Sequence, residues 1–192
     1  MNYDLKTIPP EKQRNPEYSR SDDWIVRLLK EANVGHIATR WDDQPFITPS
    51  IFWYDQERHE IYFHSNIVGR VRANIERHPQ VCFEASRVGN PLPSNVALEF
   101  SIQYASVIAF GNIRVIEDEV EKQRVLYGLI EKYFPQMSAG KEYRPITEKE
   151  LARTSAYVIS IESWSGKENW KDQAEQSDEW NPLPKGLLKP TI

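Results

Sequence analysis

The stretch "IYFHSNIVGRVRANI", residues 61–75, changes its hydrophobic pattern halfway along. Its first four residues alternate as in a β-strand, so that Phe63 lies on one face and His64 on the other. The apolar residues then recur at helical spacing, which predicts a helix over 68–77. The stretch therefore predicts a strand that passes directly into a helix.

The junction between this strand and this helix is polar and basic. Ser65 and Asn66 are typical helix-capping residues, and Gly69 permits a close approach to the backbone. The start of a helix offers unpaired N–H groups and the positive end of the helix dipole, to which Arg70 and Arg72 add two fixed charges. Such an arrangement predicts an anion site, most simply for a phosphate group.

Two residues of the junction also have plainer interpretations. Arg72 and Glu76 are four residues apart, so they could form only a surface ion pair on the helix. His64 could donate or accept a proton, or it could be a strand-end histidine that is hydrogen-bonded to the backbone. The residues alone leave both pairs of alternatives open.

The segments on both sides of the junction favour an antiparallel barrel with a few helices. Strands are separated by short connections, and no repeated βαβ rhythm is present. The patterns predict helices over 24–34, 68–77 and 119–135, a short helical turn at 147–154, and strands at 35–40, 45–54, 61–64, 81–85, 98–118 and 156–163. The first three strands are expected to form a meander.

Three local features refine this prediction. Pro49 inside the second strand removes a ladder donor, which indicates a sheet edge or a break. Gly111 indicates a bulge in the long β-rich stretch. The segment "SRVGNPLPSN", residues 86–95, is expected to be a loop because it is rich in Pro and Gly.

Composition limits the class of protein. The 192 residues suit a single domain, 1–192, with an extended arm at 1–20 and a C-terminal tail at 165–192. A net charge of −4 and a pI of about 5.7 argue against nucleic acid as a partner. No apolar run is long enough to span a membrane, and the single cysteine, Cys82, fits a cytoplasmic location.

Familiar metal and nucleotide motifs are missing from the sequence. The four histidines lack metal-ligand spacing, so no metal site is predicted, and there is no P-loop or G-x-G-x-x-G fingerprint. The segment "SWSGKENW", residues 163–170, offers Trp164 and Trp170 to stack on a planar ring and Lys167 to meet an anion. It could equally be a clasp that packs the tail on the sheet.

Taken together, the motifs resemble one protein family. The segments "FITP", "H-x-N-x-VGR-x-RAN", "LPSN", "QY-x-SV-x-x-FG" and "WSGKENW" follow one another as in the FMN-binding split-barrel proteins related to pyridoxamine 5′-phosphate oxidase. Within that family the chain looks most like the 5-nitroimidazole antibiotic resistance (nitroimidazole reductase) branch, over about residues 20–172. The resemblance implies a six-stranded antiparallel Greek-key split barrel and a homodimer with two FMN sites at the interface.

The resemblance also implies which residues hold the cofactor. Arg70 and Arg72 would meet the FMN phosphate, and His64, near flavin and substrate, would supply a proton or orient the substrate. The full set of expected FMN contacts is Thr48, Pro49, Ser50, Ile51, Phe63, His64, Ser65, Asn66, Gly69, Arg70, Arg72, Tyr104, Ser106, Trp164, Lys167 and Trp170.

The implied activity is FMN-dependent reduction of nitro groups, with a reductant such as NADH or NADPH. A pyridoxamine 5′-phosphate oxidase is a second possibility, although the end "LLKPTI" lacks the Arg-Leu-x-Pro-like element with which those enzymes bind substrate. A non-catalytic flavin or haem carrier of the same fold is a third.

Overall fold

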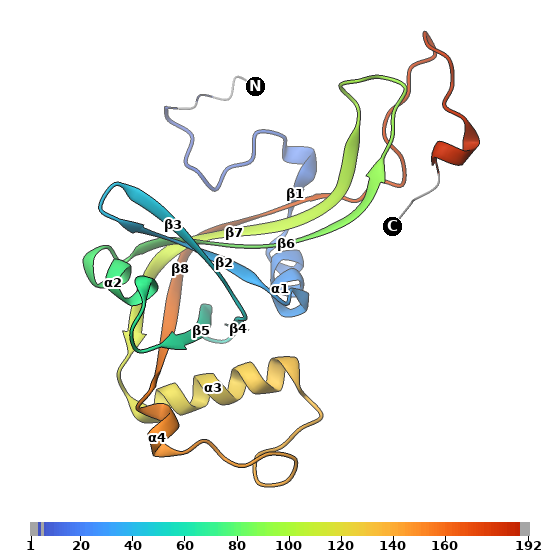
Figure 1. Cartoon of the computed structure of the whole chain (residues 1–192). Coiled ribbons are helices and arrows are strands. Elements are labelled where there is room, and N and C mark those ends of the chain that lie inside the picture. Colours follow the sequence, from blue (N-terminus) through green and yellow to red (C-terminus); the bar gives the residue numbers. More distant parts are fainter. Residues whose placement is uncertain (1–3, 5, 189–192) are drawn as a thin grey trace.

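The computed structural model describes residue 4 and residues 6–188, and at its centre is one curled antiparallel sheet (Figure 1). The strands are β1 (Ser19–Arg20), β2 (Gly35–Trp41), β3 (Gln44–Ser50), β4 (Trp53–Asp55), β5 (Glu60–Asn66), β6 (Gln80–Leu92), β7 (Ser101–Ile116) and β8 (Thr154–Asn169). The α-helices are α1 (Asp22–Glu31), α2 (Arg70–Arg77), α3 (Glu119–Tyr133) and α4 (Glu148–Leu151), and short 3₁₀ turns lie at Pro16–Tyr18 and Lys185–Leu188.

The strand order explains why the barrel is split. The order is β3-β2-β6-β7-β8-β5-β4, with β1 added beside β8, so β3 and β4 lie at opposite ends of the path. Yet only Ile51 and Phe52 separate them in the chain, which keeps the Cα atoms of Ser50 and Trp53 within about 11 Å. The sheet must therefore curl until its two edges come close, but no hydrogen-bonded ladder closes it.

This topology confirms the antiparallel split barrel and corrects two details. The described part of the chain contributes eight strands to the sheet rather than six. The expected meander is wrong because β3 pairs only with β2, and β4 pairs with β5. Pro49 lies in β3 at the edge of the sheet, as predicted.

The predicted loop at 86–95 is also wrong. Strand β6 continues to Leu92 and pairs with β7 as far as Ser101, across an irregularity between Val88 and Pro91. The irregularity absorbs the Gly and Pro residues that suggested a loop. The register shift at Gly111 on β7 confirms the predicted bulge.

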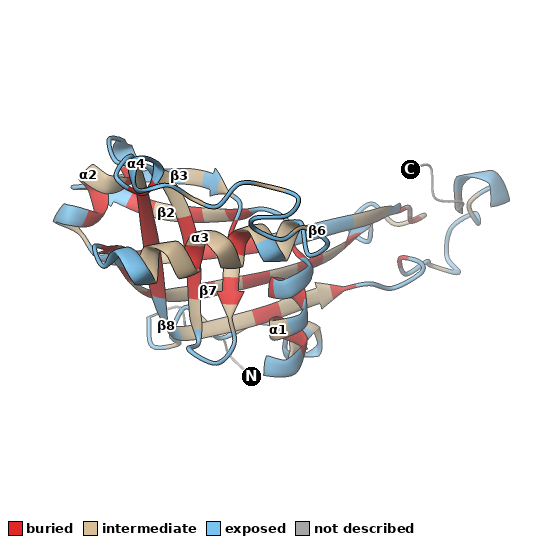
Figure 2. Ribbon diagram, turned by 90° about the horizontal axis from the view of Figure 1, so that it is seen from below, coloured by how far each residue is buried: buried red, intermediate tan, exposed pale blue. Residues whose placement is uncertain are grey.

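The helices cover different parts of the barrel. Apolar residues of α1 and α2 join the barrel core, where Ile37, Phe83 and Tyr157 are completely buried. Helix α3 instead packs on the outside of the β4-β5-β8 region, where its residue Val125 joins Tyr62 and Val158 in a second cluster. In Figure 2 the buried residues lie along the barrel strands and on the inner side of these helices. Helix α3 matches its prediction over 119–135 closely.

The tips of β6 and β7 project from the barrel, and the C-terminal segment runs beside them (Figure 1). Ser94 Oγ donates to the carbonyl oxygen of Glu175 at 2.6 Å, and Asn95 Nδ2 donates to that of Ser177 at 2.9 Å. The first part of the predicted tail, residues 165–169, belongs to β8. Residues 1–3 and 5 of the predicted arm and 189–192 of the tail lie outside the described residues.

Within the described chain, none of the helices combines the length and the apolar character that crossing a membrane requires.

Candidate functional site

The β5–α2 junction has an ordered polar backbone with open space in front of it. Asn66 Oδ1 accepts a hydrogen bond from the N–H of Val68 at 3.0 Å, and Ser65 Oγ lies 3.1 Å from Tyr157 Oη. Gly69 is the N-cap residue of α2, and a Cβ atom added to it would meet nothing within 4 Å. The space beside the N-cap residue of α2 is therefore open.

Arg70 is held by an aromatic ring rather than by a carboxylate. Its guanidinium carbon lies 5.0 Å from the centre of the Trp41 ring, and Arg77 lies 4.3 Å from the centre of the same ring. Among the described residues, Arg70 forms no ion pair. Its charge is therefore available to an anion at the start of α2.

Arg72 is engaged with two carboxylates. It forms an ion pair with Glu76 and a second one with Glu117, at 3.3 Å. The hydrogen bond from Arg72 to Glu76 is the main reason why the pKa of this guanidinium is raised. The predicted surface pair is thus confirmed in the free chain, and a phosphate would have to compete with it.

His64 lies at the end of β5, on the face directed at α3. Phe63 occupies the opposite face and stacks on Tyr157 in the barrel core, with ring centres 4.9 Å apart, so the predicted alternation is confirmed. The Nδ1 atom of His64 is buried and has no hydrogen-bond partner among the described residues. Burial lowers the pKa of His64, so its ring is neutral at pH 7.

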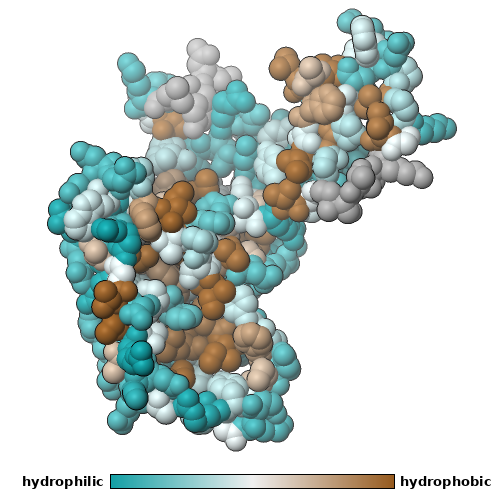
Figure 3. Space-filling model, in the orientation of Figure 1, coloured by the Kyte–Doolittle hydropathy of each residue, from teal (hydrophilic) through white to brown (hydrophobic). Residues whose placement is uncertain are grey.

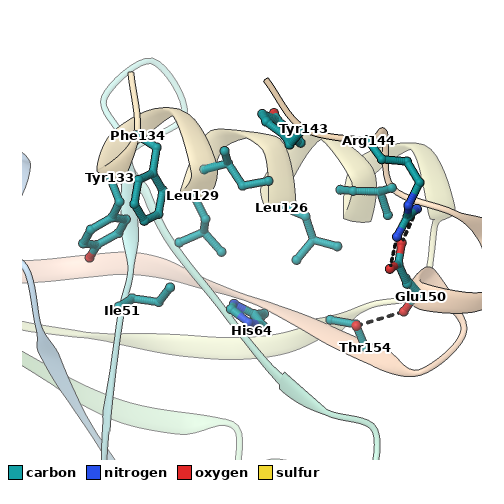
Figure 4. A pocket seen from close by; sticks show the side chains of 12 residues that line it. Ile51, His64, Leu126, Leu129, Tyr133, Phe134, Tyr143, Arg144, Glu150 and Thr154 are labelled. Carbon is teal, nitrogen blue, oxygen red and sulfur yellow. Dashed lines mark hydrogen bonds and ion pairs between the residues drawn. The ribbon is translucent and has the colours of Figure 1, made fainter. Parts of the chain in front are cut away.

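A cavity of about 420 Å³ opens over His64, between α3 and the sheet (Figure 4). Leu126, Leu129, Tyr133 and Phe134 reach down from α3 and its C-terminal end, while Ile51, His64 and Thr154 form the floor. The remaining lining residues are Ile130, Tyr143, Arg144, Ile146 and Glu150. In Figure 3 apolar side chains gather in the lower part of the view, where α3 runs beneath the sheet.

One ion pair borders this cavity. Arg144 Nη2 lies 2.6 Å from Glu150 Oε1, and Arg144 Nη1 lies 3.1 Å from Oε2 (Figure 4). The backbone N–H of Thr147 donates to Glu150 Oε2 at 2.9 Å, as part of a Thr147–Glu150 capping box at the start of α4. Arg144, followed by Thr147, lowers the pKa of Glu150 to about 2, so this carboxylate stays charged.

Several of the predicted cofactor residues lie on the outer face of the sheet. Antiparallel partners share a face, and the register places Pro49 beside His36 on that outer face. Ser106 and Lys167 are direct partners on β7 and β8 on the same face. Lys167 Nζ lies 5.2 Å from the centre of the Tyr104 ring.

Other predicted residues point into the barrel. Thr48 pairs with the core residue Ile37, and its buried Oγ1 atom has no partner among the described residues. Ser50 shares the face of Thr48. Trp164 packs against the core, and its Nε1 donates to Asp22 Oδ1 at 2.8 Å. The structure thus does not bring Phe63 or Trp164 to the outer face.

Trp170 follows the end of β8 and lies next to Arg87, whose guanidinium carbon is 4.9 Å from the ring centre. This position is separate from the His64 cavity, which has no lining residue after Thr154. In one copy of the chain, the predicted residues therefore lie in three separate places. One group is at the β5–α2 junction, a second is on the outer face of the sheet, and the remainder are in or against the barrel core.

Most of the cavity could not be predicted from the sequence. Its walls come from α3 and from the segment after it, where the helical spacing of Leu126, Leu129 and Tyr133 predicted only packing. Trp41, the ring under Arg70, was also missed because its short predicted turn carried no binding signal. No cluster of three or more His, Cys, Asp or Glu side chains that could hold a metal occurs in the described part of the chain.

Comparison with known proteins places this chain in a family. The family model described as pyridoxamine 5′-phosphate oxidase matches residues 21–168. A search of curated proteins found no match.

Three solved structures are similar in fold. A flavocytochrome from Azotobacter vinelandii has a TM-score of 0.75 and 21% identity, with 90% of this chain and 85% of that chain covered. An FAD and haem binding protein from Mycobacterium smegmatis has a TM-score of 0.74 and 23% identity, with 83% and 76% covered. A proposed 5-nitroimidazole antibiotic resistance protein from Bacteroides thetaiotaomicron has a TM-score of 0.65 and 17% identity, with 77% and 84% covered. At these identities the likeness shows a shared fold.

Proposed function

The chain belongs to the pyridoxamine 5′-phosphate oxidase family, and from that premise we propose that it is an FMN-dependent oxidoreductase with its cofactor phosphate at the β5–α2 junction. One observation carries the proposal. His64, whose buried Nδ1 atom has no partner among the described residues, lies one residue before the polar junction that leads to Arg70. A proton-carrying ring and an anion site are therefore adjacent in the fold.

The residues at the junction fit a flavin phosphate. The N–H groups at the start of α2 and the unpaired guanidinium of Arg70 supply donors for phosphate oxygens. His64 Nδ1 is a buried polar atom without a partner among the described residues, and a flavin ring edge could satisfy it. Ile51 and His64 also line the cavity, so the ring would lie at its edge.

A bound FMN would supply hydride transfer between a reductant and a substrate. The neutral imidazole of His64 has one N–H donor and one acceptor, so it can donate a hydrogen bond to a nitro oxygen and orient the nitro group. Once it has taken up a proton, the ring can supply that proton to the same oxygen. Apolar side chains of α3 line the space above the His64 ring.

The finer proposal is that the substrates are nitroimidazole-like compounds. A two-electron reduction converts R–NO₂, NADH and H⁺ into R–NO, NAD⁺ and water, and further two-electron steps lead towards the amine. The likeness in fold to the Bacteroides thetaiotaomicron protein supports this choice of substrate.

We also propose a cytoplasmic homodimer with two FMN sites at the interface. Tyr104, Ser106 and Lys167 lie on the outer sheet face rather than around the His64 cavity. A partner copy that packs on this face would let residues of two subunits meet one flavin. The molar mass in solution, measured by light scattering after gel filtration, tests this part.

A flavin or haem carrier is the second candidate. It is favoured by the position of His64, whose neutral ring faces a largely apolar cavity, and by the flavocytochrome and the FAD and haem binding protein among the similar folds. Neutral imidazole is a common haem ligand. Pyridoxamine 5′-phosphate oxidase activity is less well supported, because the cavity offers no unpaired cation for a substrate phosphate.

The absorption spectrum of the purified protein separates these candidates. We expect flavin bands, bleaching of those bands by NADH or NADPH, and their return when 2-methyl-5-nitroimidazole is added. A Soret band without flavin absorption would support the haem carrier. Flavin bands that no reductant bleaches would support a flavin carrier and would refute the proposed oxidoreductase activity.

A further inference from the structure

The cavity under α3 lies beside the place proposed for the flavin ring. We propose that it is the substrate-binding site and that it selects uncharged aromatic molecules over anionic ones, with Glu150 as a specificity-determining residue. This inference rests on the proposed function and deepens it, because it names the substrate class of the same site.

The size and the walls of the cavity suit a small ring compound. Its volume of about 420 Å³ is within the range of about 300–1,000 Å³ that is typical of small-molecule sites. Leu126, Leu129 and Phe134 provide apolar contacts above the ligand, and Figure 4 shows these side chains pointing towards His64. Such walls favour a flat molecule with little polar surface.

The floor of the cavity offers one polar contact. The buried Nδ1 atom of His64 has no partner among the described residues, and a buried polar atom is usually satisfied by protein, water or ligand. Thr154 Oγ1 already has a partner, because it donates its proton to the carbonyl oxygen of Glu150 at 2.9 Å, so towards a ligand it could only accept. The ligand should therefore carry one group that can hydrogen-bond to an imidazole.

Charge decides which ligands are rejected. Among the twelve lining residues, Arg144 and Glu150 are the charged pair, and both guanidinium Nη atoms bond to the carboxylate. Thr147 also holds this carboxylate through its backbone N–H. Because both Nη atoms of Arg144 are bonded to Glu150, an anion that enters the cavity finds no free cation among the lining residues.

Two matched probes test the selectivity. Nitrobenzene and 4-nitrobenzoate share the nitro group, but only the second is an anion. Their dissociation constants are measured by titration calorimetry on the FMN-loaded protein and on the flavin-free protein, so that the readout does not depend on turnover. We expect nitrobenzene to bind at least about tenfold more tightly than 4-nitrobenzoate, which corresponds to about 1.4 kcal/mol. Equal affinities would overturn the inference.

Two variants place the binding in this cavity. Leu126→Trp fills the space and should abolish nitrobenzene binding, whereas Val120→Trp, at a position on α3 whose side chain is 77% exposed, should leave it unchanged.

A second pair of variants tests the role of Glu150 in selectivity. Glu150→Gln frees Arg144 while a glutamine can still serve the capping box, so the preference for nitrobenzene should fall about fivefold. Glu148→Gln, on the same helix but outside the cavity lining, is the control.

The outcomes separate this inference from the proposed function. If Leu126→Trp does not fold, the Glu150→Gln result decides: an unchanged preference overturns the inference. Normal FMN binding together with equal affinities for the two probes would remove the selectivity and leave the flavin proposal standing. If nitrobenzene binds in the cavity but the protein never binds FMN, the inference about the cavity would stand and the flavin proposal would be refuted.

Discussion

Replacing Arg70 with alanine should weaken FMN binding more than any other single change at the junction. In the free chain this guanidinium stacks on Trp41 and forms no ion pair with a described residue, so it is free to bind a phosphate. Arg72 must first give up Glu76 and Glu117, which offsets part of what it gains from the same phosphate. The two arginines are therefore not equivalent, although the sequence places them two residues apart.

The size of the effect follows from the type of contact. A hydrogen bond to a charged group contributes about 1.5–3 kcal/mol, which corresponds to a loss of about 10- to 150-fold in affinity for Arg70→Ala. Arg72→Ala should cost less than Arg70→Ala. Glu76→Gln should tighten FMN binding, because it removes one competitor for Arg72.

The assay is quenching of flavin fluorescence, with FMN and riboflavin titrated in parallel at one fixed salt concentration. Riboflavin lacks the phosphate, so its affinity should hardly change in these variants, and the preference for FMN should shrink in Arg70→Ala. Arg70→Lys keeps the charge but loses the planar fork, so it should fall between the wild type and the alanine variant. Wild-type FMN affinity and an unchanged preference over riboflavin in Arg70→Ala would refute the phosphate assignment.

Three further predictions concern His64 and α3. His64→Gln should keep the flavin but lower nitro reduction at least about 100-fold, the lower end for general acid–base catalysis, and an unchanged turnover number would remove His64 from the reaction. Because burial lowers the folded-state pKa of His64 below 6.5, the unfolded chain takes up the proton first, and the free energy of unfolding should fall as the pH drops through 6.5. The fall should be smaller in His64→Gln. If urea titrations at pH 7.5 and 5.5 give the same fall in unfolding free energy for the wild type and for His64→Gln, this prediction is wrong. Gly128→Ala should destabilise the fold by about 1–3 kcal/mol despite its better helix propensity, because the new Cβ would lie 2.6 Å from a ring carbon of Trp53, and a higher Tm than wild type would show that the ring moves aside freely.

Local patterns were sufficient to predict much of the barrel. The alternation at Phe63 and His64, the edge position of Pro49 and the bulge at Gly111 each follow from rules that act over a few residues, and the structure confirms them. The pairing partners could not be predicted in this way. The expected meander failed because the chain crosses from one sheet edge to the other at Ile51 and Phe52, and only the curl of the whole sheet brings those edges together.

The candidate site shows the same division. The capping residues and arginines of the β5–α2 junction are adjacent in sequence, so an anion site there could be proposed from a short segment. The cavity could not, because its floor at His64 and its roof at Leu126 and Tyr133 are about sixty residues apart along the chain. An amphipathic helix that packs on a core and one that roofs a cavity have the same sequence pattern.

The most direct test of the central claim is a crystal structure of the protein grown with FMN. We expect the phosphate at the start of α2 within hydrogen-bonding distance of the Arg70 guanidinium, and the flavin ring beside His64. Electron density for FMN at another place on the protein, with Arg70 still stacked on Trp41 and remote from the phosphate, would contradict the account.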